Sequence, residues 1–198
     1  MPGTFLALKT ARLLKDKMEE NKSSLIIRRA SKEDTVALAD FSRNAFEEAF
    51  GAENDTEDMQ VYLDTSFSRE QIGHELADLE TTFLLAYQKD TLVGYAKIQG
   101  GPPPDCAHDK EAVQLSRLYV TWACMGRGLG SQLIQACLDE SRQQGYEAIW
   151  LGVWEKNIPA QRLYERSGFV RSGTKKFVLG SDIQQDVVYT RALDSMHL

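Results

Sequence analysis

The stretch Gln114-Leu-Ser-Arg-Leu-Tyr-Val-Thr-Trp-Ala-Cys-Met-Gly-Arg-Gly-Leu-Gly-Ser131 decides the fold of this chain. Its apolar first half is typical of a buried strand, and its second half predicts a glycine-rich turn that opens into a helix. The glycines let the backbone approach a ligand closely. Because the first turn of a helix presents free N–H groups and the positive end of the helix dipole, the stretch predicts a phosphate site.

Glycine-rich phosphate loops fall into classes that differ in spacing. A Walker loop ends in Gly-Lys-Ser/Thr, whereas Gly128-Leu-Gly-Ser131 lacks the lysine. A dinucleotide loop follows the first strand and has the spacing G-x-G-x-x-G, which Gly126-Arg-Gly-Leu-Gly130 does not share. Both classes are therefore disfavoured. The residues predicted to hold the phosphates, through backbone amides and one guanidinium, are Gly126, Arg127, Gly128, Leu129, Gly130 and Ser131.

The composition is that of an ordinary globular domain. Of 198 residues, 42% are hydrophobic and 26% are charged. The formal net charge of −6 disfavours a nucleic-acid binder and suits a small cationic substrate. No apolar run is long enough to span a membrane, and the scattered cysteines and histidines predict neither a disulfide framework nor a metal site. We expect a cytoplasmic protein with no metal, nucleic-acid or membrane partner.

The order of the predicted elements indicates one α/β domain over residues 25–194, with residues 1–24 as a flexible or loosely docked N-terminal extension. The loop that starts with the prolines at 102–104 is expected to lie on the surface. Strands alternating with helices predict a mixed sheet with helices on both faces. Strands are predicted at 25–29, 82–87, 91–99, 113–121, 148–154, 169–179 and 183–191, and helices at 31–50, 59–76, 131–145 and 157–168.

Acidic residues are concentrated between positions 47 and 64, where the sequence has no Lys or Arg. Two interpretations are open for this segment: a solvated helical face, or a wall that attracts an amine. The residues concerned are Glu47, Glu48, Glu53, Asp55, Glu57, Asp58 and Asp64.

Two motifs in the right order resemble the GCN5-related N-acetyltransferase (GNAT) superfamily. Met125-Gly-Arg-Gly-Leu-Gly130 is similar to the pyrophosphate loop of that family, Gln/Arg-x-x-Gly-x-Gly/Ala, with Met125 in the Gln/Arg position. The residues Asn157, Ala160, Tyr164 and Gly168-Phe169 match its pattern Asn-x-x-Ala-x-x-x-Tyr…Gly-Phe. The resemblance extends over roughly residues 25–193. It implies the acyl-CoA N-acyltransferase fold, with a mostly antiparallel mixed sheet.

The resemblance also implies a reaction, the transfer of an acetyl group from acetyl-CoA to an amine. It places the pantetheine arm of the cofactor beside Leu118, Tyr119 and Val120 and a polarising backbone N–H near Val120. Tyr164 takes the position of the general acid that protonates the departing thiolate, and it also contacts the cofactor. Asn157 contacts the cofactor arm. Family members are often dimers, so a homodimer is compatible with the resemblance.

A narrower resemblance, to bacterial spermidine/spermine N-acetyltransferases, implies a polyamine acceptor that attacks directly in a ternary complex. It rests on segments 58–63, 67–71 and 150–157, together with Phe177-Val-Leu-Gly and Gln185-Asp-Val. Two alternatives stay open: acetylation of a protein N-terminus or lysine, and a non-catalytic acyl-CoA-binding regulatory module.

The amine must lose a proton before it attacks, because a free alkyl amine has a pKa near ~10.4. Relatives often carry a Glu on the strand before the glycine loop, whereas this chain has Gln114, which cannot act as a base. Several routes stay open: Glu111, a water chain ending on Glu155, an acidic residue of the 47–64 segment, or attack by the small uncharged fraction of the amine.

Overall fold

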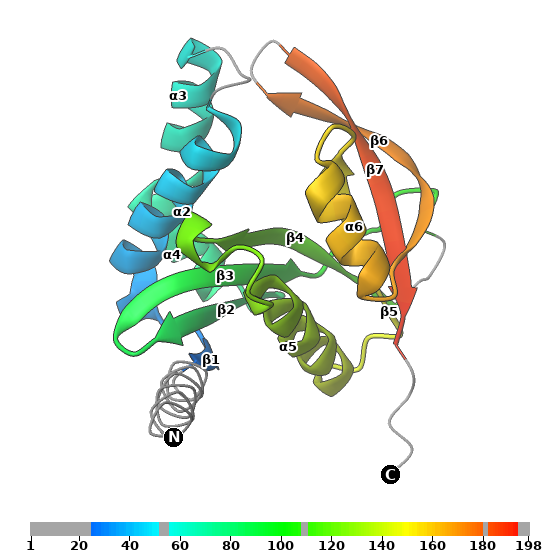
Figure 1. The fold of residues 1–198 in the computed structure, drawn as a ribbon, viewed down its shortest axis with the longest axis horizontal. Coiled ribbons are helices and arrows are strands. Elements are labelled where there is room, and N and C mark those ends of the chain that lie inside the picture. Colours follow the sequence, from blue (N-terminus) through cyan, green and yellow to red (C-terminus); the bar gives the residue numbers. More distant parts are fainter. Residues whose placement is uncertain (1–24, 52–55, 108–110, 180–181, 194–198) are drawn as a thin grey trace, which may run out of the picture.

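The computed structural model describes residues 25–51, 56–107, 111–179 and 182–193, and the predicted extension at 1–24 lies outside them. Seven strands form one sheet in the order β1-β2-β3-β4-β5-β7-β6 (Figure 1). All neighbouring strands are antiparallel except β4 and β5. The predicted mixed, mostly antiparallel sheet is therefore confirmed. The strands are β1 (Leu25–Arg29), β2 (Thr81–Gln88), β3 (Thr91–Gln99), β4 (Ala112–Val120), β5 (Ala148–Trp154), β6 (Val170–Leu179) and β7 (Asp182–Ala192).

Helices cover both faces of this sheet, as the sequence predicts. Figure 1 shows the blue-to-cyan helices α2, α3 and α4 grouped together, apart from α5 and α6. We call the two sides the α2–α4 face and the α5–α6 face. The helices are α2 (Thr35–Phe50), α3 (Thr56–Ser66), α4 (Arg69–Ala77), α5 (Leu129–Gln143) and α6 (Ile158–Arg166), and two 3-10 turns are η1 (Lys32–Asp34) and η2 (Trp122–Cys124).

Three helix boundaries differ from the sequence prediction. The single helical region expected over 59–76 is two helices, because Ser68 caps α4 by accepting a hydrogen bond from Gln71 N at 3.1 Å. The first turn after Ser31 is a 3-10 turn, in which Ser31 N donates to Asp34 Oδ2 at 2.8 Å. The helix behind the glycines begins at Leu129, so Gly130 lies inside its first turn.

The two faces have cores of different composition. The core under α5 and α6 is mostly aliphatic and takes alternate residues from β2, β3, β4, β5 and β7. The core under α2–α4 takes the intervening residues and is rich in aromatic rings. Its buried members are Leu38, Ala39, Phe46, Met59, Leu63, Phe67, Ile72, Phe83, Leu85 and Tyr95.

A bulge in β4 determines which side chains of this strand face each core. Leu115 pairs with Ile98 and Arg117 pairs with Lys97, so Ser116 is an extra residue without a partner in β3. The extra residue reverses the alternation of side chains along the rest of the strand. The α5–α6 core accordingly receives Val113, Leu115, Leu118 and Val120, while Arg117 and Tyr119 face α2–α4.

The proline loop after β3 lies only partly on the surface, which corrects the expectation of a plain surface loop. Gly101 and Pro102 are exposed, but Ala107 is 2% exposed and packs with Trp150 and Val188. A Cβ atom added at Gly173 of β6 would lie 2.5 Å from Cys106 Cβ, which shows how closely the loop meets the sheet. The loop is anchored because its apolar end replaces a helix over this part of the sheet.

Candidate active site

The sheet opens between β4 and β5. Their pairing covers only Ala112–Gln114 of β4 and Ala148–Trp150 of β5 and then ends. Beyond that point β4 continues to Val120, while β5 stays paired with β7 to its last residue. An open strand side presents backbone groups that an extended, amide-containing ligand can pair with. The predicted residues Leu118, Tyr119 and Val120 lie along this opening, which we call the fork.

The glycine loop follows β4 and presents bare backbone to solvent. Gly126 and Gly128 have φ angles of +71° and +83°, a conformation that side chains disfavour. An added Cβ at either residue would meet no atom within 4 Å, so open space surrounds this backbone. Arg127 and Ser131 are exposed as well. The loop therefore fits a diphosphate bound by amides at the start of α5.

Two of the predicted loop residues have a packing role besides any ligand contact. Leu129 is 5% exposed and belongs to the α5–α6 core. A Cβ atom added at Gly130 would lie 3.0 Å from Leu163 Cδ2, so the glycine lets α5 approach α6 closely. These contacts fix the loop relative to α6.

Helix α6 begins directly after Asn157, its N-cap, and carries Tyr164. Asn157 Oδ1 caps the helix by accepting a hydrogen bond from Ala160 N at 3.2 Å. The ring of Tyr164 meets Phe169 edge-on with a centroid separation of 5.9 Å and shares the core with Leu118 and Val120. Burial raises the pKa of Tyr164, so its hydroxyl stays protonated over the physiological range. The residue can therefore donate a hydrogen bond toward the fork.

Aromatic rings from distant segments gather on the α2–α4 face of the fork. Tyr119 of β4 stacks on Tyr95 at 5.6 Å between ring centroids. Ring pairs also connect α2 and α3 with strands β5 and β6. The ring centroids of Phe50 in α2 and Trp154 in β5 are 6.2 Å apart, and those of Tyr62 in α3 and Phe177 in β6 are 6.1 Å apart. We call these rings the aromatic cluster: Phe46, Phe50, Tyr62, Phe67, Tyr95, Tyr119, Trp154 and Phe177.

A buried ion network ties α4 to the sheet beside the aromatic cluster. Glu75 Oε1 lies 2.9 Å from Lys97 Nζ, and Glu75 Oε2 lies 2.7 Å from Arg117 Nη1. Arg117 Nη2 also donates to the carbonyl oxygen of Ser66 at 3.3 Å, which anchors the end of α3. Burial favours the neutral acid, but the charges of Arg117 and Lys97 outweigh it and hold the pKa of Glu75 below its ordinary value. No sequence pattern indicates this network, because its members lie far apart in the chain.

A second buried carboxylate lies on β7. Asp186 is 7% exposed, and its Oδ2 lies 3.6 Å from Lys175 Nζ on β6. Burial raises the pKa of Asp186, and the ammonium of Lys175 opposes that rise. Both side chains lie over Gly152 of β5, where an added Cβ would be 2.9 Å from Asp186 Oδ2 and 2.5 Å from Lys175 Cε. Sequence reasoning did not select Asp186 as a site residue.

Most of the carboxylates that the sequence analysis considered as general bases are exposed to solvent. Glu111 and Glu155 are exposed, one before β4 and the other after β5. Gln114 is half-buried, and its Oε1 accepts a hydrogen bond from Gln99 Nε2 at 3.3 Å. In the acidic segment, Asp64 is exposed and lies 2.7 Å from Arg43. Glu47, Glu48 and Glu57 are also exposed, which favours the solvated-face interpretation, while Glu53 and Asp55 lie outside the described residues.

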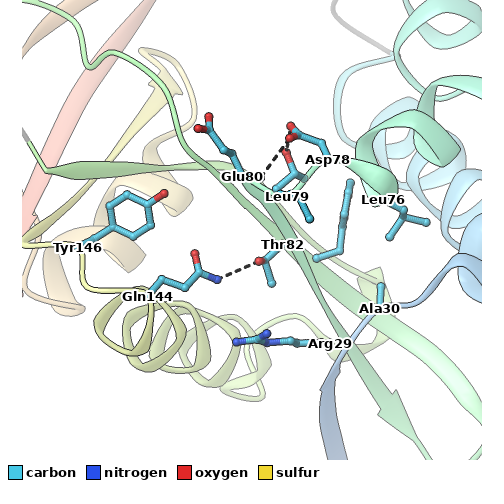
Figure 2. Close-up of a pocket in the computed structure, with 11 residues that line it drawn as sticks. Arg29, Ala30, Leu76, Asp78, Leu79, Glu80, Thr82, Gln144 and Tyr146 are labelled. Carbon is cyan, nitrogen blue, oxygen red and sulfur yellow. Dashed lines mark hydrogen bonds between the residues drawn. The ribbon is translucent and has the colours of Figure 1, made fainter.

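A pocket elsewhere in the molecule contains none of the predicted site residues (Figure 2). It lies between the first residues of β2 and the end of α5, where Gln144 Nε2 donates to Thr82 Oγ1 at 3.0 Å. Its Asp78 accepts a hydrogen bond from Thr81 Oγ1 at 2.9 Å. Because neighbours already bind these polar groups, we assign no chemistry to this pocket.

Within the residues that the structure describes, His, Cys, Asp and Glu side chains form no group of three or more that is placed to hold a metal ion. None of the helices in this part of the chain is long and apolar enough to cross a membrane.

Comparison with known proteins gives consistent matches. The profile of the acetyltransferase (GNAT) family matches residues 42–169. An uncharacterized N-acetyltransferase from Lactobacillus delbrueckii subsp. lactis is 30% identical over 163 residues, covering 82% of this chain and 94% of the relative. The spermine/spermidine N(1)-acetyltransferase of Bacillus subtilis is 32% identical over 92 residues, which are 46% of this chain and 60% of that protein.

Among solved structures, the PaiA N-acetyltransferase from Thermoplasma acidophilum in complex with coenzyme A is similar in fold. The TM-score is 0.71 at 21% sequence identity, over 85% of this chain and 99% of that structure.

Proposed function

This chain belongs to the acetyltransferase (GNAT) family, and from that premise we propose that it acetylates a primary amine of a small polyamine such as spermidine or spermine. Family membership confirms the resemblance of the two sequence motifs and makes the chain an acetyl-CoA-dependent N-acetyltransferase. We further propose which residues act on the acceptor and in which order the steps occur.

The fork is the observation that carries the proposal. It lies behind an exposed glycine loop and ends beside Tyr164 and the aromatic cluster. Acetyl-CoA supplies an acetyl group activated as a thioester. We assign its diphosphate to the amides of 126–131 and to Arg127, and its amide-containing arm to the open side of Leu118–Val120. Asn157, which caps α6 at the mouth of the fork, contacts the same arm.

The chain's own groups then act on the reacting atoms. A backbone N–H near Val120 stabilises the oxygen of the carbonyl as negative charge develops there. Tyr164 donates a hydrogen bond to the departing sulfur, and its proton follows. A phenol is a weaker acid than a thiol, and burial weakens Tyr164 further. The residue therefore assists the departure of sulfur rather than driving it. The amine attacks directly, with both substrates bound.

The acceptor class follows from the opposite side of the fork. An aromatic cluster beside a buried carboxylate, that of Asp186, suits a flexible chain of methylene groups that carries ammonium groups. The relative from Bacillus subtilis that is named for spermine and spermidine supports the same class. The three cysteines are free, and we place the reaction in the reducing cytoplasm.

An acceptor panel tests the proposal. Free-thiol release from acetyl-CoA is measured with the purified full chain and spermidine, spermine, short diamines or a lysine-containing peptide. Turnover with the polyamines supports the proposal, and turnover with the peptide alone would replace the acceptor by a protein. Binding of acetyl-CoA without turnover of any amine would contradict the proposal and favour a regulatory module.

A further inference from the structure

The proposed reaction leaves the acceptor's proton unassigned, and the most deeply buried carboxylate near the fork is not yet used. That carboxylate is Asp186, which is 7% exposed. Gln114 cannot act as a base, and Glu111 and Glu155 are exposed. Glu75 already holds two cations at 2.7 and 2.9 Å. The contact of Asp186 with Lys175 is longer, at 3.6 Å.

The side of the sheet occupied by Asp186 follows from the alternation of β7. Val187 and Tyr189 belong to the α5–α6 core, so Asp186 and Val188 face the other way. Tyr164 belongs to the α5–α6 core. The carboxylate and the phenol therefore approach the fork from opposite faces of the sheet, so one can serve the attacking amine and the other the departing sulfur.

Gly152 places the carboxylate at the mouth of the fork. It lies two residues beyond Trp150, the last residue of β5 that pairs with β4. A Cβ atom at this position would lie 2.9 Å from Asp186 Oδ2, so the carboxylate rests directly on the β5 backbone. The space that a side chain at position 152 would fill is occupied by Lys175, whose Cε would lie 2.5 Å from the added Cβ atom, so an acceptor reaches the carboxylate from the fork when Lys175 moves away.

We propose that Asp186 binds the ammonium group of the acceptor and takes its proton before attack, and that Lys175 holds this position until the acceptor arrives. This assignment rests on the proposed amine acetylation. Lys175 can leave because its side chain is 28% exposed and its ammonium lies 3.6 Å from the carboxylate, beyond hydrogen-bond distance. Trp154 is paired with Asp186 across β5 and β7, and Lys156 Nζ lies over its ring at 5.3 Å from the centroid, so this ring already attracts a cation.

The groups that face Asp186 set its proton affinity. From β6 comes the ammonium of Lys175, and from α3 comes the hydroxyl of Tyr62. Burial raises the pKa of Tyr62, and the charge of Asp186 adds to that rise. Burial likewise raises the pKa of Asp186 against the opposing effect of Lys175, which makes the carboxylate a better proton acceptor than an exposed aspartate.

The protons balance over one turnover. Asp186 takes one proton from the ammonium, which becomes a neutral amine. The amine nitrogen forms a bond to the carbonyl carbon, and the bond from that carbon to sulfur breaks. The sulfur receives the proton of Tyr164, and the second nitrogen proton returns to the tyrosine through water. Asp186 releases its proton to solvent, so the products are an N-acetylamine, a thiol and one proton.

The test compares acceptors of different basicity. The kcat/KM of wild type and of Asp186→Asn is measured for a diamine and for a fluorinated alkylamine that is uncharged at neutral pH. We expect the substitution to lower kcat/KM about a hundredfold for the diamine, with a loss about tenfold smaller for the uncharged amine. Affinity for acetyl-CoA is expected to stay unchanged. Equal losses for the two amines, or no loss, would overturn the assignment.

Two substitutions in β6 test the proposal through the position of the pH profile, which a general loss of folded protein would not move. Lys175→Met removes the cation that opposes protonation of Asp186, so the acid limb of the kcat/KM profile is expected to move to higher pH. Lys176→Met, which changes the exposed next residue of β6, serves as its matched control and should leave the profile in place. A profile that stays unmoved in Lys175→Met would contradict the proposal.

Failure of this inference differs from failure of the proposed function. If wild type turns over no amine, the proposed function is wrong. If wild type acetylates the diamine and Asp186→Asn matches it at every pH, only the role of Asp186 is wrong. Because burial disfavours the charged carboxylate, the Asn variant is expected to melt no lower than wild type at neutral pH. A lower melting temperature together with equal losses for both amines would indicate a structural role.

Discussion

The two faces of the sheet are built in different ways. The α5–α6 face is packed with aliphatic side chains, and the groups that we assign to the reaction on this side come from two short segments, 114–131 and 157–169. The α2–α4 face has aromatic rings and buried ions whose partners lie far apart in the chain, such as Glu75 and Arg117, which are 42 positions apart. In the proposed reaction, the first face holds acetyl-CoA and the second receives the amine.

This difference fits separate roles for the two faces in the proposed reaction, cofactor binding on one and acceptor recognition on the other. A ligand common to a whole family can be held by local backbone features, namely a glycine loop, a helix start and an open strand side. A variable acceptor is instead recognised by side chains that tertiary packing brings together, which can change without altering the fold. Each substitution described next changes residues on one face and leaves those of the other face unchanged.

The largest effect is expected from breaking the ion network on the α2–α4 face. Glu75→Ala leaves Lys97 and Arg117 buried without their anion, which typically costs about 3–5 kcal/mol of unfolding free energy. Urea unfolding measures this loss, with Glu70→Ala, an exposed residue of the same helix, as control. An unchanged unfolding free energy in Glu75→Ala would show that the network does not hold α4 on the sheet.

The next effect concerns the α5–α6 face. Tyr164→Phe keeps the buried ring and removes the hydroxyl, so we expect kcat to fall about a hundredfold, or about 2.7 kcal/mol, with unchanged affinity for acetyl-CoA. Tyr146→Phe, in the pocket of Figure 2, is the control. Since burial raises the pKa of Tyr164, its deprotonation should add no alkaline limb below pH ~10. An unchanged kcat would remove Tyr164 from the mechanism.

A smaller effect is expected from the glycine loop. At a φ of +83°, Gly128→Ala has free space for its Cβ but an unfavourable backbone conformation, which costs about 1–2 kcal/mol. If that conformation holds the phosphates, affinity for acetyl-CoA falls about tenfold, as titration calorimetry would measure. Gly73→Ala, inside α4 with an ordinary 3.8 Å contact, should leave this affinity unchanged. Equal affinities in both variants would argue against the loop as the phosphate site.

The smallest effect concerns the start of α2. Asp34 accepts from Arg28 Nη2 at 2.7 Å and from Ser31 N at 2.8 Å, and the Arg28 side chain lowers its pKa to about 2. Asp34→Ala is expected to cost about 1 kcal/mol at neutral pH. Because the folded pKa is depressed, this contribution is complete above the ordinary value of 3.8 and is lost as pH falls towards 2. A variant whose deficit in thermal stability is the same at pH 7 and pH 2 would contradict this account.

The sequence predicted the α5–α6 face well because its signals are local. The strand, the glycine loop, the Asn157 cap and the position of Tyr164 each follow from a few neighbouring residues. The sequence analysis did not predict the bulge at Ser116, although the spacing of Leu115 and Leu118 departs from the strict alternation of a regular strand. The groups on the α2–α4 face were not predicted, because no sequence spacing connects residues that meet only through tertiary packing. Examples are Asp186 with Gly152 and Glu75 with Lys97. The acidic segment, although conspicuous in sequence, is mainly solvated.

The most direct test of the division between faces is chemical-shift mapping of the ¹⁵N-labelled full chain. We predict that coenzyme A shifts the amides of 118–120 and 126–131, and that a diamine added afterwards shifts those around Trp154, Lys175 and Asp186. Shifts from coenzyme A confined to the α2–α4 face, or to the pocket of Figure 2, would contradict the account.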